Sequence, residues 1–279
     1  MFTLNENQAW EAVLERFPFE GYIPVARKHA YVEMPRAIKR YLPVGSEILD
    51  FGAGSCDKTA MMSLQGFNVT AFDDWGDDWY TFGDNESKIL TFAEQCAINY
   101  IKKFEQIAEK KYDAIVLNNV VEHLHDSPRV LLNELLRSLK SGGYLFIAVP
   151  NAANFRKRIA IMLGKTNYPS YESFFWSADP WRGHVREYVE SDLIKLAKFL
   201  NLEEKQVYSH HYHLDQVSEP YRSAFVGLCK IFPGWRETWM LVAKKNAGWT
   251  EKLQPSFDEA KVALKKHYFK YKEEDLKWK

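Results

Sequence analysis

The sequence contains little cysteine, and its three cysteines show no pairing pattern. Cys56, Cys96 and Cys229 lie far apart and form no CxxC motif. An odd count without that spacing argues against a disulfide framework and against a zinc site built from cysteines. Reduced cysteines are typical of a reducing compartment, so we expect a cytoplasmic protein.

An excess of charge of one sign and long hydrophobic runs are also missing. Lys and Arg total 37, and Asp and Glu total 37, so the formal net charge is zero. This balance requires neither a nucleic-acid backbone nor an anionic membrane as an obligatory partner, although it leaves room for a local basic patch. No stretch approaches the roughly 20 apolar residues that span a bilayer, and the first residues lack a signal-peptide pattern. We therefore expect a soluble protein without a membrane span.

The sequence does contain enough apolar residues for one large α/β domain. Of its 279 residues, 46% are hydrophobic and 27% are charged, which is ordinary for a chain with a sizeable core. Apolar residues recur at helical spacing over residues 5–17 and 28–41, and prolines interrupt the pattern. These segments predict a helical N-terminal flap over residues 1–44.

From Ile48 onwards the sequence alternates strand, loop and helix patterns. EILDF, FNVTAF, DAIVLN and YLFIAVP are strand patterns, a weaker strand is expected around residues 97–101, and Ser127-Pro128 indicates a helix start. The alternation predicts an α/β fold whose mostly parallel sheet has helices on both faces, with its core at residues 45–150. Residues 189–247 complete the sheet, and residues 248–279 form a C-terminal helix.

Residues 151–188 form a long aromatic insertion after the strand that ends at Pro150. A simple connection to the next element needs fewer residues, and this segment is rich in Phe, Tyr and Trp. Aromatic rings most often pack a core, but they also stack on sugar rings. We interpret the insertion as a lid over a substrate pocket.

The strongest local motif is DFGAGSC at residues 50–56, where a strand runs into a turn that opens a helix. Gly52 and Gly54 let the backbone around Ala53 lie against a ligand, and the free N–H groups of the helix face the same point. The dinucleotide fingerprint GxGxxG requires a third glycine at position 57, which is Asp57 here. The motif therefore disfavours a nicotinamide or flavin cofactor.

Further polar residues follow the ends of neighbouring strands. Asp73 lies 23 positions after Asp50, where a carboxylate can accept both hydroxyls of a ribose. Asp74 comes next and either joins this site or faces solvent. Asn118 and Asn119 end the strand DAIVLN at the sheet edge where open α/β sheets bind ligands. These positions predict one binding crevice.

Together these motifs resemble the class I S-adenosylmethionine-dependent methyltransferases. The matching segments are ILDFGAGSC, VTAFDD, YDAIVLNNVVEHLHD and LKSGGYLFIAVPN. The resemblance implies a Rossmann-like seven-stranded sheet with an antiparallel last strand. It also implies that the Gly52–Gly54 turn lies near the amino-acid part of the cofactor and that Asp73 binds its ribose. Asp50, at the start of the same motif, is a further candidate cofactor-binding residue. The family's carboxylate after the third strand is absent, so Phe104 is our candidate for the adenine contact.

The acceptor is suggested by two further resemblances. NNVVEHLHD and GHVREY resemble the ubiquinone-pathway O-methyltransferases and the type 11, 12 and 23 methyltransferase group, and residues 150–188 are similar to methyltransferases of bacterial sugar and surface-polysaccharide biosynthesis. They imply O-methylation of a small-molecule or glycan acceptor. The alternatives are N-methylation of an amino sugar, an RNA or protein acceptor, and a non-catalytic binding module. Arg156, Lys157 and Arg158 form too short a cluster to indicate a basic groove, which disfavours nucleic acid.

Methyl transfer requires the enzyme to align the acceptor with the cofactor and to remove a proton from a hydroxyl. His123 and His184 are the candidate bases, and packing of each as a structural histidine is the alternative. Asn119, Glu122 and His123 would share one face of a helix that begins at residue 119, where they could hold a divalent cation. Related O-methyltransferases carry a Glu-x-x-Glu-His metal motif, but its first glutamate is Asn119 here. We therefore assign no metal ligand and keep Glu122 as a candidate catalytic residue.

Two remaining features have a structural interpretation. His210, His211 and His213 alternate along an expected strand, which would place His211 and His213 on one face, and we interpret them as hydrogen-bonded or exposed histidines. The tail from Ser256 predicts an amphipathic, charged helix. This helix offers a surface for a homo-oligomer.

Overall fold

The computed structural model describes residues 3–76, 78–178 and 180–264. A sheet of seven strands forms its centre, with the order β3-β2-β1-β4-β5-β7-β6. The strands are β1 (Glu47–Phe51), β2 (Asn68–Phe72), β3 (Asn99–Ile101), β4 (Tyr112–Asn118), β5 (Leu139–Pro150), β6 (Glu203–His210) and β7 (Thr238–Lys244). Strand β7 runs antiparallel to both β5 and β6, whereas the other neighbouring strands are parallel. The expected mixed sheet with an antiparallel last strand is confirmed.

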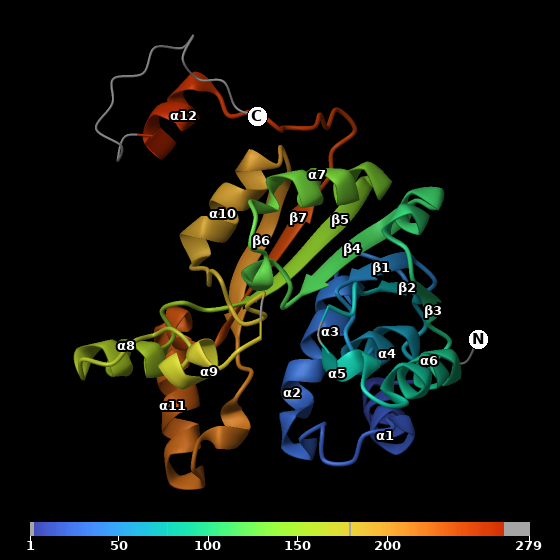
Figure 1. The fold of residues 1–279 in the computed structure, drawn as a ribbon, viewed down its shortest axis with the longest axis horizontal. Helices are drawn as coiled ribbons and strands as arrows, with labels where there is room; N and C mark the ends of the chain where they lie inside the picture. Colours follow the sequence, from blue (N-terminus) through green and yellow to red (C-terminus); the bar gives the residue numbers. More distant parts are fainter. Residues whose placement is uncertain (1–2, 77, 179, 265–279) are drawn as a thin grey trace.

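Helices cover both faces of this sheet (Figure 1). They are α1 (Glu6–Arg16), α2 (Lys28–Tyr31), α3 (Glu33–Lys39), α4 (Asp57–Ser63), α5 (Asp78–Thr81), α6 (Asn85–Gln95), α7 (Pro128–Ser138), α8 (Phe155–Met162), α9 (Tyr171–Phe175), α10 (Glu190–Phe199), α11 (Glu219–Ile231) and α12 (Phe257–Leu264). The helix predicted over residues 28–41 is divided at Val32 into α2 and α3. In the part of the chain that the structure describes, no helix combines the length and apolar character needed to cross a bilayer.

Alternating side chains of the central strands build a core on each face of the sheet. Ile115 and Leu117 of β4 pack with α7 and α10, whereas Ala114 and Val116 pack with α3 and α4 on the other face. This alternation follows from the two-residue period of a strand, and both sets are apolar because both faces are covered. The motifs at the ends of β1, β2 and β4 are thereby fixed to a rigid support.

The segment 151–188 leaves the sheet and returns to the same place. Asn151 forms an isolated parallel bridge with Tyr188, and the Ala152 N–H donates to the Tyr188 carbonyl at 3.0 Å. The Asn151 side chain donates to the carbonyls of Gly234 and Arg236, which anchors the departure point. Helices α8 and α9 lie on this excursion, and Figure 1 shows them with α11 at one end of the molecule.

The C-terminal region is described only in part. The helix expected over residues 248–279 begins only at Phe257, because residues 248–256 form no helix, and α12 ends at Leu264 among the described residues. Residues 265–279 of the expected helix lie outside the described residues. The predicted use of this helix for a homo-oligomer stays a prediction.

Candidate active site

The turn after β1 requires its glycines. Gly52 has φ +76°, and a Cβ there would lie 2.4 Å from a methyl carbon of Val120. Gly54 has φ +54°, and a Cβ there would lie 2.8 Å from the Tyr80 hydroxyl. Left-handed backbone and close approach both favour glycine. The turn therefore brings bare backbone to the end of the sheet, at the start of α4.

Asp73 closes this turn from the end of β2. Its Oδ2 accepts the Gly54 N–H at 2.7 Å, and its Oδ1 accepts the Trp75 N–H at 2.8 Å. Burial raises the pKa of Asp73, although both backbone hydrogen bonds act to lower it. The carboxylate borders a cavity of about 530 Å³ that also contacts Asp74, Asn119 and His123. This cavity has the polar and apolar walls that a nucleoside requires.

Phe51 and Phe72 supply the apolar wall of the Asp73 cavity. Phe104, the predicted adenine contact, packs edge-on against these two rings, with centroids 6.1 and 5.9 Å away. The two other rings, rather than Phe104, border the cavity. Phe104 therefore supports the wall from behind, and its direct contact with adenine stays a prediction.

A second cavity, of about 320 Å³, lies on the other side of the glycine turn. Asp50, Gly54, Asn118 and Lys58 are among the residues that border it. Asp50 accepts a hydrogen bond from Thr59 Oγ1 at 2.6 Å, and burial raises the pKa of Asp50 to about 6. This cavity presents carboxylates, amides and a lysine, which are groups that can bind the amino-acid part of the cofactor.

The N-terminal helices complete this second cavity. Tyr31 of α2 donates a hydrogen bond from its hydroxyl to Asp57 Oδ2 at 2.5 Å, and Ser55 donates to the other carboxylate oxygen at 2.9 Å. Lys58 lies over the ring of Tyr212, with its Nζ 4.9 Å from the centroid. Tyr31, Lys58 and Tyr212 were not predicted from the sequence, because their places depend on tertiary packing and follow no motif.

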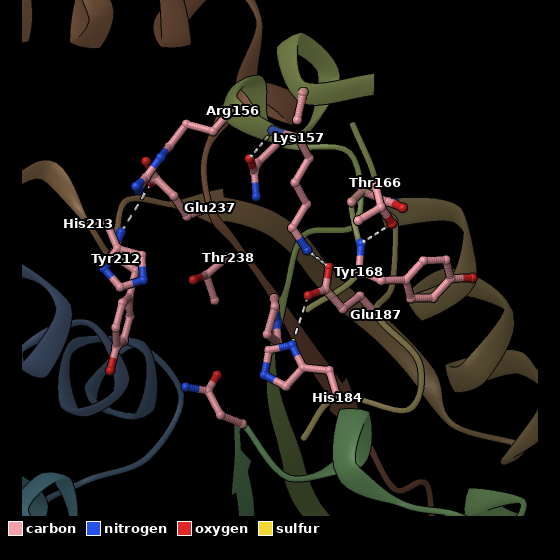
Figure 2. Close-up of a pocket in the computed structure, with 15 residues that line it drawn as sticks. Arg156, Lys157, Thr166, Tyr168, His184, Glu187, Tyr212, His213, Glu237 and Thr238 are labelled. Atoms are coloured by element: carbon pink, nitrogen blue, oxygen red, sulfur yellow. Dashed lines mark hydrogen bonds and ion pairs between the residues drawn. The ribbon is translucent and has the colours of Figure 1, made fainter. Parts of the chain in front are cut away.

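A third cavity, of about 540 Å³, lies under the segment 151–188. Figure 2 shows Lys157, Glu187 and His184 in a row on one side of it, with Tyr212 and His213 on the opposite side. His184 Nδ1 lies 2.8 Å from Glu187 Oε1, and Lys157 forms an ion pair with the other oxygen of the same carboxylate. Glu187 was not predicted, although it stands three residues after His184 in GHVREY.

His184 also contacts the other predicted base. The rings of His123 and His184 meet edge to face, with centroids 4.9 Å apart. His123 Nδ1 lies 2.8 Å from the Arg182 carbonyl, so this nitrogen carries the proton, and Nε2 lies 3.9 Å from Glu122 Oε1. Burial, together with the nearby His123 and Lys157, lowers the pKa of His184 to about 4. The His184 imidazole is therefore neutral at neutral pH.

Glu122 lies beneath the two histidines. Its side chain is fully buried, and its two carboxylate oxygens have no hydrogen-bond partner among the described residues. Burial raises the pKa of Glu122 to about 8. Glu122, His123 and His184 each offer a ligand atom, and these atoms lie within 4.8 Å of one another. The structure thus brings together the three predicted catalytic residues.

The expected helical face of Asn119, Glu122 and His123 is wrong. Asn119 has φ +61°, and the short 3-10 helix begins two residues later, at Val121. This left-handed residue turns the chain before the helix begins. Asn119 instead borders all three cavities, and His184 takes the place next to Glu122 and His123.

The histidines after β6 lie differently from their predicted places. Strand β6 ends at His210, so His211 and His213 lie beyond it and do not share a strand face. His211 Nδ1 lies 3.1 Å from Glu237 Oε2, as expected for a hydrogen-bonded histidine. His213 borders the third cavity beside Tyr212.

The fold and these three cavities, which meet at the carboxyl ends of β1, β2 and β4, define an S-adenosylmethionine-dependent methyltransferase. Comparison with known proteins agrees. A family model described as a methyltransferase domain matches residues 26–206, and the chain belongs to this family. The fold and the family of the chain are thus those of the S-adenosylmethionine-dependent methyltransferases.

Individual relatives cover parts of the chain. It is 31% identical over 122 residues to a ubiquinone biosynthesis O-methyltransferase of Rickettsia bellii, which is 42% of this chain and 46% of that protein. A protein with the same description from Rickettsia akari is 28% identical over 123 residues, covering 43% and 46%. The matches thus span about half the length of these curated relatives.

A solved structure supports the fold. Phosphoethanolamine N-methyltransferase 2 of Haemonchus contortus, in complex with S-adenosyl-L-methionine, aligns with a TM-score of 0.50 and 15% identity, over 87% of this chain and 57% of that chain. At this identity the likeness shows the fold alone.

Proposed function

We propose that the protein transfers the methyl group to a hydroxyl of a small-molecule acceptor held in the third cavity. The observation that carries the proposal is the contact of His123 with His184 at the junction of the cavities, where Glu187 orients the His184 ring. A neutral imidazole whose Nδ1–H donates to a carboxylate leaves Nε2 free to accept a proton. That arrangement supports O-methylation, because a hydroxyl must lose its proton and the cofactor cannot take it.

The lining of the third cavity favours a polyhydroxylated acceptor such as a sugar. Thr166, Asn167 and Thr238 offer hydroxyl and amide groups, and the ring of Tyr168 borders the same space. Such groups can pair with several hydroxyls, while a ring packs on the apolar face of a sugar. O-methylation also agrees with the described activity of the Rickettsia relatives. An amino sugar, methylated on nitrogen, is the second candidate.

The residues beneath the histidines also fit a divalent cation. The two buried carboxylate oxygens of Glu122 lack a hydrogen-bond partner among the described residues, and His123 Nε2 lies 3.9 Å from Glu122 Oε1. His123 and His184 each have Nδ1 engaged, which leaves Nε2 as the nitrogen that can bind a cation. Histidine ligands typically donate their second N–H to a carbonyl or carboxylate in this way. When bound, the cation would lower the pKa of an acceptor hydroxyl. Glu122, His123 and His184 would hold it, and Asn119 is not required.

The experiment screens free and nucleotide-linked sugars with S-adenosylmethionine and detects a gain of one methyl by mass. His184→Ala should then lower turnover by about 10² to 10⁴ if it is the base, while calorimetry shows unchanged affinity for S-adenosylhomocysteine. Activity that EDTA removes and Mg²⁺ or Zn²⁺ restores supports the cation. Full activity in both His123→Ala and His184→Ala would contradict the proposal and leave alignment alone as the mechanism.

A further inference from the structure

One end of the molecule carries a dense group of exposed apolar side chains, which we name the apolar end. It comprises nine large residues of α8, α9, their connecting loop and the residue after α9: Ile159, Ile161, Met162, Leu163, Tyr168, Tyr171, Phe174, Phe175 and Trp176. Met162 is 80% exposed and Trp176 is 79% exposed. Single exposed apolar residues are normal, but such a gathering marks an interaction surface.

Only the first residue of helix α8 makes aromatic contacts with the rest of the described chain. Its first residue, Phe155, packs against Phe225 of α11 and against Trp235, with ring centroids 5.6 and 5.0 Å away. Further along, Ile159, Ile161 and Met162 are exposed, and their spacing points them in different directions around the helix axis. The last turn of α8 therefore carries apolar side chains on more than one side, and no residue of the helix is buried. Figure 1 shows this end of α8 projecting from the molecule.

The segment that carries the apolar end, residues 155–176, is positively charged, although the whole chain is neutral. Residues 155–176 contain four basic residues and one acidic residue, Glu172. Within the described chain, Lys157 pairs with Glu187, whereas Arg158 and Lys165 form no ion pair with a carboxylate. Two copies joined through this face would bring like charges together, so the charge favours an anionic partner over self-association.

We propose that the apolar end binds the surface of an anionic lipid bilayer. Its aromatic and aliphatic side chains enter the headgroup region, and Arg158 and Lys165 contact lipid phosphates. Aromatic and aliphatic residues interleaved with Lys and Arg are typical of proteins that lie on a membrane interface. The contact is peripheral and goes beyond methyl transfer. Ala160 and Tyr168 also border the third cavity. Binding of the apolar end to a bilayer would therefore bring that cavity close to the lipid surface.

The test is sedimentation of the full chain with vesicles of phosphatidylcholine alone or mixed with phosphatidylglycerol. We expect binding to the anionic vesicles that weakens with added salt, and little binding to phosphatidylcholine. Met162→Asp and Trp176→Asp should each weaken binding by roughly tenfold or more, because each removes a buried apolar contact and adds a negative charge. Phe82→Asp is the matched control, since Phe82 is 78% exposed but lies outside the apolar end.

Three outcomes would overturn the proposal. Wild-type protein that stays in the supernatant with anionic vesicles is one, and equal loss of binding in Phe82→Asp is another. The third is a dimer in light scattering that Trp176→Asp converts to a monomer without lipid, which would assign the surface to a second copy. Calorimetry with S-adenosylhomocysteine on every variant shows whether the cofactor site is intact, so that a specific loss of lipid binding is distinguished from misfolding of the variant.

Discussion

Asp73 shows at the scale of single residues how the site is prepared before the cofactor binds. Its two oxygens already accept the backbone N–H groups of Gly54 and Trp75. The remaining lone pairs of the carboxylate are available to ribose hydroxyls, because each oxygen can accept more than one hydrogen bond. The same residue thus shapes the glycine turn and offers the predicted ribose contact.

Replacing this carboxylate should weaken cofactor binding. Asp73→Ala removes charge-assisted hydrogen bonds, so calorimetry should show a loss of about 1 to 3 kcal/mol in the binding of S-adenosylhomocysteine. Asp73→Asn, which keeps one acceptor oxygen, should show a smaller loss, and Asp84→Ala at an exposed site should show none. Unchanged affinity in Asp73→Ala would place the ribose elsewhere.

Asp50 should make the stability of the protein depend on pH. Its pKa is about 6 in the folded protein, above the value of about 3.9 for an unfolded chain. A carboxyl whose folded pKa is raised stabilises the fold fully below the unfolded pKa, and this contribution falls as pH rises from about 4 to about 6. At neutral pH the free energy of unfolding is therefore lower by about 3 kcal/mol than it would be with Asp50 protonated.

Urea unfolding at several pH values measures this effect. The decline in the free energy of unfolding between pH ~3 and ~7 should be smaller by about 3 kcal/mol in Asp50→Asn, which carries no charge and can still accept the Thr59 hydrogen bond. Other titrating groups are the same in both proteins, so the difference between the two pH profiles isolates Asp50. Identical profiles would show that Asp50 ionises as easily in the folded as in the unfolded chain.

At the scale of elements, the segment 151–188 is an excursion whose two ends are tied together by the bridge between Asn151 and Tyr188. Shortening it beyond this bridge should therefore leave the sheet intact. We expect that a short Gly-Ser linker in place of residues 163–178 abolishes methyl transfer, because it removes part of the third cavity. Affinity for S-adenosylhomocysteine should remain, as measured by calorimetry. Normal transfer by the shortened protein would show that the segment is structural packing.

The elements that sequence predicts well are those with strong local signals. Strands β1, β4 and β5 were found because both of their faces are buried and read as apolar runs. Helix α7 begins at Pro128 with Ser127 as its N-cap, as predicted. The break at Val32 and the left-handed Asn119 were missed, because no Gly or Pro marks either one. Tertiary packing decides both places.

In the active site, too, some residues could be placed from local sequence patterns and others only from tertiary packing. Residues at strand ends could be assigned to one crevice because parallel strands present their carboxyl ends at one edge. His123 and His184 are 61 positions apart, and only the path of the chain after β5 brings their rings together. Glu187 could have been found as a carboxylate three residues from a candidate base, but Lys58 and Tyr212 depend on how α4 packs against the region after β6.

At the scale of the whole molecule, the second and the third cavity share part of their wall, because Asn119 and Tyr212 border both of them. A molecule bound in the second cavity therefore forms part of the surface that a molecule entering the third cavity contacts. We expect an ordered reaction in which S-adenosylmethionine enters first and S-adenosylhomocysteine leaves last. Product-inhibition kinetics would show S-adenosylhomocysteine as competitive against the cofactor and noncompetitive against the acceptor, whereas random order would make the methylated product competitive against the acceptor. The shared wall would then set the order in which the two substrates bind and the two products leave.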